Sequence, residues 1–129
     1  MKDTLWKNTL LLVVGFLLIC MIGIIVEAQF KLFRRSYDNF ILDNRNHYLS
    51  CKDLPTTAEV ERIVEQHRAA IQQMQEIAPG FVEVEIDTSN CAGKADLLIS
   101  YGTHEQRIAI EKLINGDTFF GIPYRLQNR

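Results

Sequence analysis

The stretch FVEVEIDTSNCAGKADLLISY, residues 81–101, places two apolar segments on either side of a polar loop. Apolar and acidic residues alternate strictly over residues 81–87, which is typical of a strand that buries one face. Residues 96–101 are more apolar and predict a second strand, with residues 88–95 as the connecting loop. The acidic side chains of the first strand, which point away from its apolar face, are Glu83, Glu85 and Asp87.

Helical patterns lie on both sides of this hairpin. A capping box at residues 56–59 opens an amphipathic helix of about twenty residues, which ends at the Pro-Gly pair of residues 79–80. A second capping box at residues 103–106 opens a helix that stops at the Asn-Gly pair of residues 115–116. The hairpin is therefore expected to pack against two helices.

Two further segments predict strands: HYLSC, residues 47–51, and TFFGIPYRL, residues 118–126. The resulting order is βαββαβ, the ferredoxin-like layout of an antiparallel four-stranded sheet with both helices on one face. In that layout the last strand lies at an edge, where Pro123 is tolerated because it cannot donate to a ladder. The sequence therefore predicts an α+β domain with a ferredoxin-like sheet.

The positions of Cys51 and Cys91 agree with this layout. A right-handed crossover makes the first and second strands parallel, so the end of the first strand and the hairpin loop meet at one end of the sheet. A Cys51–Cys91 disulfide closes a loop of about forty residues and stabilises the fold by about 3–4 kcal/mol on the chain-entropy model. Stable disulfides belong to oxidising compartments, so we expect the domain outside the cytoplasm.

Residues 9–26 form an apolar run without a charged side chain. Such a run nearly spans a hydrocarbon core of about 30 Å. It can be a retained signal-anchor or a cleaved signal peptide, for which residues 26–28, Val-Glu-Ala, approximate a cleavage site. The run is longer than the ~7–15 residues of a signal core, so we expect a retained single-pass anchor. Cys20 within it is interpreted as a small apolar filler.

Two sets of residues in and after this run are candidate partner contacts. Gly15 and Gly23 fall roughly on one helix face and admit a close neighbour helix. Four aromatic residues follow at spacings of three, four and three, and this helical stripe predicts that the membrane helix continues to about Leu42. The aromatic stripe faces either a partner helix or the chain's own domain. Its members are Phe30, Phe33, Tyr37 and Phe40.

We therefore divide the chain into a tail and membrane anchor at residues 1–28, a helical stalk at 29–43 and a globular domain at 44–129. Two rules give opposite orientations of the chain across the membrane. Four basic residues follow the span, against two lysines and the terminal amine before it, which by the positive-inside rule places the domain in the cytoplasm. We give more weight to the cysteine pair and predict an extracytoplasmic domain, in a bacterial periplasm or at a cell exterior.

Few residues predict chemistry. His47, His67 and the two outer cysteines lack the spacing of a metal site, so no metal or cofactor is expected. Cys91 with His104 or His47 as base is the enzyme hypothesis, but pairing with Cys51 explains Cys91 better. The acidic ridge Glu83, Glu85 and Asp87 is a candidate site for a cation or basic partner, or a solvated strand that resists aggregation. Leu98, Phe119, Pro123 and Arg125 are expected to share the open sheet face with this ridge.

The chain has a net charge of −2 and a pI near 5.9, which gives no general attraction to nucleic acid. In layout it resembles the short single-pass subunits of envelope machines, but residues 9–26 lack the ionisable group of a proton path. We expect a non-catalytic accessory or assembly subunit whose partners are other membrane proteins and the bilayer. A homo-oligomer is left open. The alternatives are a membrane-tethered sensor of a ligand or ion at the open sheet face and, with less support, an enzyme that uses Cys91 or His104.

Overall fold

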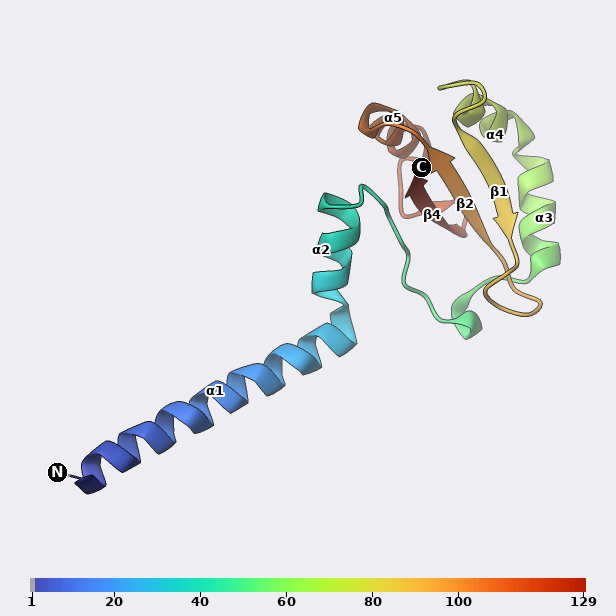
Figure 1. The fold of residues 1–129 in the computed structure, drawn as a ribbon. Helices are drawn as coiled ribbons and strands as arrows, with labels where there is room; N and C mark the ends of the chain where they lie inside the picture. The colour runs from blue at the N-terminus through green and yellow to red at the C-terminus, as the bar shows by residue number, and fades with distance from the viewer. Residues whose placement is uncertain (1) are drawn as a thin grey trace. The chain divides into compact units, whose positions relative to one another are not determined.

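The computed structural model describes residues 2–129, with side chains from residue 6 onward, and divides them into two units, one up to Tyr37 and one from Asp38 to Arg129. The first unit contains α1 and most of α2, and the second contains the α+β domain (Figure 1). The elements are α1 (Lys2–Phe30), α2 (Leu32–Phe40), η1 (Cys51–Asp53), α3 (Thr57–Gln66), α4 (Arg68–Gln75), β1 (Glu83–Asp87), β2 (Asp96–Tyr101), α5 (His104–Ile114), β3 (Thr118–Phe119) and β4 (Ile122–Asn128).

The sheet has four strands in the order β1-β2-β4-β3. β1 and β2 form the predicted antiparallel hairpin, but β2 and β4 are parallel neighbours, and the connection between them runs through α5 and the short β3. β3 pairs antiparallel with β4. The α+β class is confirmed. The antiparallel prediction is wrong, because the sheet is mixed, and the ferredoxin-like layout is not confirmed.

The predicted strand at residues 47–51 does not form, and its local hydrogen bonds give the reason. The Asn46 side-chain oxygen accepts from the Tyr48 N–H at 3.0 Å, and His47 Nδ1 accepts from the Leu49 N–H at 2.9 Å. Tyr48 also has a positive φ of 56°. Side chains thus take the N–H groups that a ladder needs. Before this segment, Arg45 forms an isolated bridge with Leu126 of β4.

The predicted last strand is divided by a turn. Phe120 and Gly121 both have positive φ, 49° and 90°, as a two-residue hairpin turn requires, and the chain reverses there between β3 and β4. β4 lies between β2 and β3, so the prediction that it is an edge strand is wrong. Pro123 is accommodated because the ladder with β2 begins one residue later, at Tyr124.

The predicted helix caps of the domain are present. The Thr56 side chain accepts from the Glu59 N–H, and the Thr103 and Gln106 side chains form a complete capping box at the start of α5. The long helix predicted after Thr56 is interrupted at His67, which separates α3 from α4. The His67 ring stacks on the exposed Phe120 ring, with 3.5 Å between the centroids.

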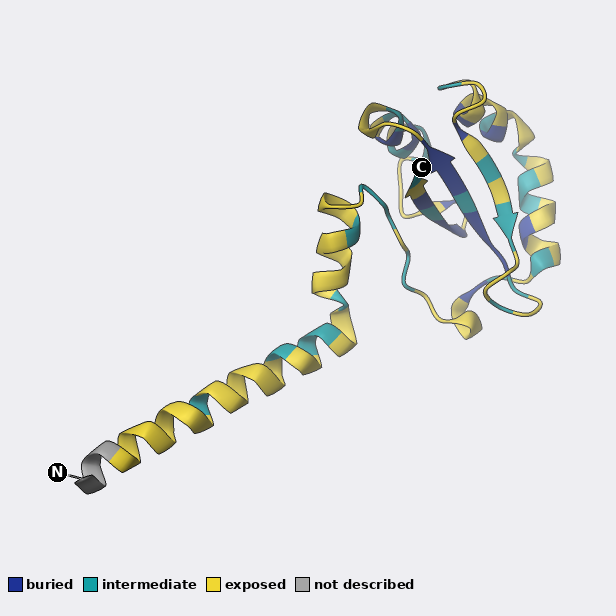
Figure 2. Ribbon diagram, in the orientation of Figure 1, coloured by how far each residue is buried: buried dark blue, intermediate teal, exposed yellow. Residues whose placement is uncertain are grey.

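All three helices of the domain pack on one face of the sheet. β2 is buried along most of its length (Figure 2), and its residues 97, 99 and 101 point into the core. The opposite face carries the side chains of residues 83, 85 and 87, which alternate with the core-facing residues 84 and 86. The core cluster comprises Val60, Ile71, Met74, Val82, Ala95, Leu97, Ile99, Tyr101, Ile110, Phe119, Ile122, Tyr124 and Leu126.

Candidate functional site

The membrane-length helix is the first candidate surface. The segment Trp6–Phe30 is long and apolar enough to cross a membrane, and no part of its most apolar stretch is buried within the chain. Its side chains therefore do not serve as a protein core, although a signal sequence near an N-terminus forms the same kind of helix. Retention of the anchor stays a prediction.

Gly15 and Gly23 lie within this helix with open space beside them. A side-chain carbon added at either glycine would meet no atom within 4 Å. Both positions can thus accept a closely packed neighbour helix. The free Cys20, also exposed, has no other cysteine in its part of the described chain.

The membrane-length helix ends at a break that the sequence did not predict. Lys31, between α1 and α2, has a positive φ of 50°. The Glu27 carboxylate accepts from the Phe33 N–H at 2.8 Å and from the Arg34 N–H at 3.3 Å. A carboxylate at this position satisfies the unpaired N–H groups of the first turn and opposes the positive end of the helix dipole. Glu27 therefore caps α2.

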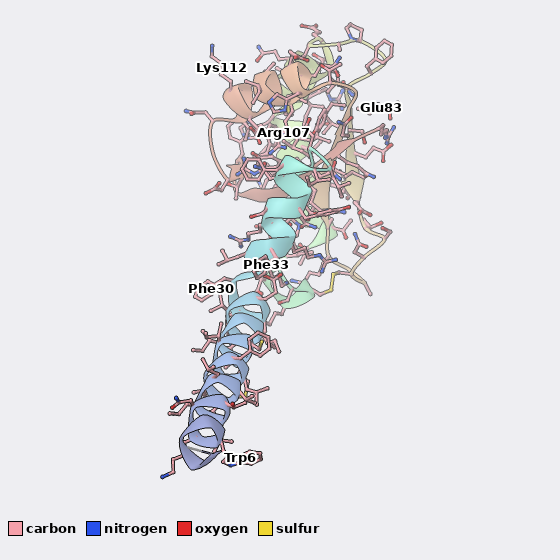
Figure 3. The ribbon with its side chains drawn as sticks, turned by 60° about the vertical axis from the view of Figure 1, so that its left-hand side comes forward. Trp6, Phe30, Phe33, Glu83, Arg107 and Lys112 are labelled. Carbon is pink, nitrogen blue, oxygen red and sulfur yellow. A yellow bond between two sulfur atoms is a disulfide. The ribbon has the colours of Figure 1, made fainter. Side chains whose placement is uncertain are left out.

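The break divides the predicted aromatic stripe. Phe30 is the last residue of α1, while Phe33, Tyr37 and Phe40 belong to α2. All four side chains are exposed, at 61, 73, 55 and 80 %. Figure 3 shows Phe30 and Phe33 on either side of the break.

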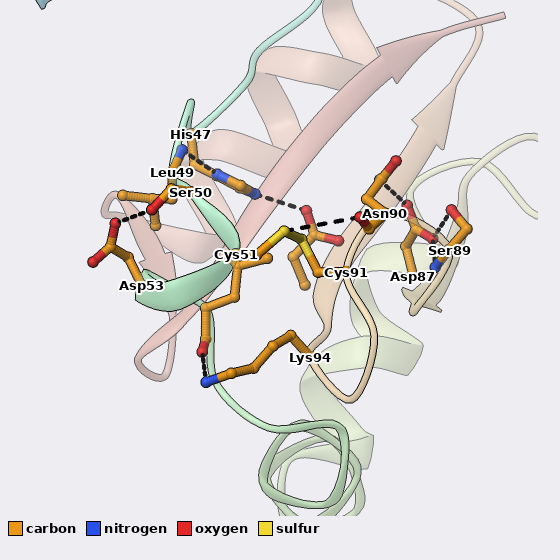
Figure 4. The surroundings of a disulfide bond; sticks show 12 residues. His47, Leu49, Ser50, Cys51, Asp53, Asp87, Ser89, Asn90, Cys91 and Lys94 are labelled. Atoms are coloured by element: carbon orange, nitrogen blue, oxygen red, sulfur yellow. Dashed lines mark hydrogen bonds and ion pairs between the residues drawn. A yellow bond between two sulfur atoms is a disulfide. The ribbon is translucent and has the colours of Figure 1, made fainter.

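The predicted disulfide between Cys51 and Cys91 is confirmed, with 5.5 Å between the Cα atoms (Figure 4). Cys51 opens the short helix η1, and Cys91 lies in the loop between β1 and β2. Backbone bonds continue the connection, since the Ala95 N–H donates to the Pro55 carbonyl at 3.2 Å. The pair meets although the strand from which we predicted it is missing. A disulfide at this place indicates an oxidising compartment.

His47 next to this disulfide has both ring nitrogens engaged. Nε2 lies 2.7 Å from Asp96 Oδ2, and Nδ1 accepts the Leu49 N–H. Because a backbone N–H can only donate, Nδ1 carries no proton, and the proton of the neutral ring sits on Nε2 toward Asp96. Cys91 is bound to Cys51. The pair proposed for an enzyme, Cys91 with His47, therefore has neither a free thiolate nor a free base in this form.

Arg125 links the carboxylates at one end of the open sheet face. It donates to Asp96 through Nε at 2.6 Å and pairs with Asp87 through Nη2. Burial raises the pKa of Asp96, but hydrogen bonds from His47 and Arg125 outweigh it and the pKa lies below its usual value. Hydrogen bonds from Ser89 and Arg125 likewise lower the pKa of Asp87 against the opposing effect of burial.

The acidic ridge is thus largely neutralised within the domain. Glu83 pairs with Arg129 and Asp87 with Arg125, while Glu85 is exposed and has no ion pair within residues 6–129. In the same part of the chain no group of three His, Cys, Asp or Glu residues is placed to hold a metal.

The apolar residues expected on that face are distributed differently. By strand alternation Leu98 and Pro123 lie on that face with Arg125, and Leu98 is half-buried, whereas Phe119 belongs to the core. Pro123 is buried.

A second polar cluster surrounds Arg107 on α5 (labelled in Figure 3). Arg107 is 5 % exposed and donates to Asp43 Oδ1 at 2.8 Å and to Glu111 Oε1 at 3.3 Å. It also donates to the Asn39 side chain in the last turn of α2, and His104 Nδ1 lies 2.8 Å from the same Asp43 oxygen. Burial opposes the charge of Arg107, but the carboxylates raise its pKa above the usual value.

The loop before Arg45 is held by this cluster. The Tyr101 hydroxyl donates to the Asp43 carbonyl, and burial, followed by the charge of Asp43, raises the pKa of Tyr101 to about 12. Arg45 donates to Asp117 at 2.6 Å and lies over the Tyr124 ring. Residues 39–45 are therefore attached to α5 and to the sheet by charged side chains rather than by apolar packing.

Sequence patterns missed both polar clusters. Arg107 lies three residues before the buried Ile110, on the apolar side of its helix, and Asp96 opens an otherwise apolar strand. A charged residue in a buried stripe is the signal that could have found them. Arg107 contacts Asn39 and Asp43, and Asp96 contacts His47 and Arg125; no sequence pattern placed these partners beside them.

Comparison of the chain with models of protein families, with curated protein sequences and with solved structures finds no match.

Proposed function

We propose that the protein is a non-catalytic, single-pass accessory or assembly subunit of a membrane protein complex, with its domain on the extracytoplasmic side. The observation that supports this most is the exposed apolar helix Trp6–Phe30 joined to a domain that carries a disulfide. The helix provides an anchor, and the disulfide suits an oxidising compartment.

The charged groups of the domain also favour a role in interaction over a role in chemistry. Arg107, Arg125 and His47 are each directed toward carboxylates of the domain itself. Groups engaged in this way stabilise the fold, whereas catalytic acids and bases need a side that faces a substrate. The alternative of a sensor at the open sheet face has less support, because Asp87 and Asp96 already pair with Arg125.

The contact with a membrane-embedded partner is proposed for the α1 face that contains Gly15 and Gly23, with Phe30 at its end. Close approach of helices at small residues provides dispersion contacts within the bilayer, where no hydrophobic driving force between helices exists. A second copy of this chain and a different subunit would use the same face.

Co-purification tests the proposal. Full-length tagged protein extracted in mild detergent is expected to carry a stoichiometric partner, and the pair Gly15→Ile with Gly23→Ile should reduce its amount by about tenfold, equivalent to about 1.4 kcal/mol. The matched control is Leu17→Ile with Met21→Ile, on the opposite face of α1, which should retain the partner. If the unchanged protein were strictly monomeric after purification in detergent, the proposal would be wrong.

A further inference from the structure

The helix α2 has two different sides. Phe33, Tyr37 and Phe40 follow one another at spacings of four and three and so share one face. Asp38 and Asn39 lie on the opposite side, where Tyr48 donates to the Asp38 carboxylate and Arg107 to Asn39. One side of α2 therefore has partners in the chain, and the aromatic side remains exposed.

A helix of this length needs a surface to cover that aromatic side. α2 has nine residues, and isolated helices shorter than about 12–15 residues are marginal in water. Two phenylalanines exposed at 73 and 80 % would add an unfavourable apolar surface to a helix that is already weak. The cap from Glu27 stabilises its first turn but covers none of the aromatic side.

The position of α2 in the chain suggests which surface covers it. The membrane-length segment ends at Phe30, and α2 begins two residues later, after the break at Lys31. A break at this point allows a helix to leave the axis of the span at the level of the lipid headgroups. It also makes one continuous partner helix along Phe30, Phe33 and Tyr37 less suitable, because these residues no longer share one helix.

The basic residues near the aromatic side of α2 are suited to binding an anionic lipid surface. Residues 31–37, KLFRRSY, contain three basic residues and no acidic one. Short amphipathic helices with basic and aromatic residues lie in the interface, with the apolar face about 5–10 Å deep and the basic side chains at anionic headgroups.

We propose that α2 is an interfacial helix that docks on an anionic phospholipid surface, with Phe33, Tyr37 and Phe40 inserted among the lipids. This inference rests on the proposed membrane anchor and adds a second, peripheral attachment to it. It assigns the aromatic residues of α2 to lipid rather than to a protein partner.

Fluorescence quenching in nanodiscs tests the inference on the full-length chain. In a Trp6→Phe background, a single tryptophan is introduced by Phe33→Trp or, as the matched control on another side of α2, by Arg35→Trp. The nanodiscs contain phosphatidylcholine alone or an equimolar mixture with phosphatidylglycerol, each with lipids brominated on the acyl chain. An intact Cys51–Cys91 disulfide reports that each variant has folded.

The indole introduced at position 33 should emit at shorter wavelength and be quenched on the order of threefold more strongly than the one at position 35, most of all with phosphatidylglycerol. Arg34→Gln should weaken that lipid dependence. Equal, water-like emission at both positions overturns the inference. Leu17→Trp in the same background separates the two proposals, since its failure to be quenched would reject the membrane anchor itself.

Discussion

Arg107 holds together two parts of the domain that are distant in sequence, α5 and the segment at residues 39–43. Its guanidinium reaches Asn39, Asp43 and Glu111 from a buried position on α5. One oxygen of Asp43 is buried without a hydrogen-bond partner among the described atoms. The negative charge of this carboxylate is therefore compensated through contacts of its other oxygen. Loss of the arginine would leave a poorly compensated charge, which is costly.

Replacement of Arg107 is therefore expected to destabilise the domain strongly. Arg107→Met should lower the free energy of unfolding by about 3 kcal/mol, measured by denaturant unfolding of the full-length chain in micelles. The control Arg62→Met removes an exposed arginine that donates to Gln66 and should change stability by less than about 0.5 kcal/mol. Equal stability of the two variants would contradict the role of Arg107.

The lowered pKa of Asp96 leads to a prediction about how the stability of the domain depends on pH. Its pKa in the folded chain lies below the usual 3.8, because bonds from His47 and Arg125 outweigh burial. A carboxyl group with a lowered pKa stabilises the fold above its unfolded pKa, and this contribution is lost as the pH falls through the usual value toward the folded one. Stability should thus decline below a pH of about 4.

Asp96→Asn tests this dependence. The variant should lose about 2 kcal/mol at neutral pH, and its stability should fall less than that of the unchanged chain as the pH drops below about 4. Part of the decline should remain, since the pKa of Asp87 is lowered as well. Glu85→Gln, at an exposed carboxylate without an ion pair, is the control. Parallel profiles for the Asp96 variant and the unchanged chain would show that the interpretation of Asp96 is wrong.

At the scale of elements, the sequence correctly predicted those helices and strands whose positions depend on residues close together in the chain. Capping residues located the starts of α3 and α5, and strict alternation located β1. The failures have local causes as well. Side-chain bonds to the backbone at residues 46–49 replaced a strand, and the pair Phe120–Gly121 divided another. The pattern of polar and apolar residues does not indicate such a turn when its first residue is an apolar phenylalanine.

The turn between β3 and β4 yields a prediction about Gly121. Its φ of 90° is unfavourable for a residue with a side chain, so Gly121→Ala should destabilise the domain by about 1 kcal/mol. Gly116→Ala is a suitable control, because Gly116 has no positive φ and an added carbon would lie 3.9 Å from its nearest neighbour. Thermal unfolding of both variants provides the comparison. A Gly121 variant no less stable than the Gly116 variant would be inconsistent with this turn.

At the scale of the whole molecule, composition and cysteine placement correctly predicted the membrane-length apolar helix and the disulfide, while retention of that helix as an anchor stays a prediction. The contacts of the two polar clusters were not predicted, because each joins elements that are distant in sequence. Arg125 on β4 contacts Asp87 and Asp96 on two other strands. Arg107 on α5 contacts Asn39 and Asp43, which lie far earlier in the chain. Orientation depends on a conflict between rules: the basic residues after the span favour the cytoplasm, whereas the disulfide favours the opposite side.

Thiol labelling in cells measures that orientation most directly. In a Cys20→Ser background, intact and lysed cells that contain the full-length protein are treated with a membrane-impermeant maleimide, with and without an impermeant reductant. The account predicts that Cys51 and Cys91 are unreactive without reductant and become labelled in intact cells once reductant is added. Ready labelling without reductant, or labelling only after lysis, would contradict an exported, disulfide-linked domain.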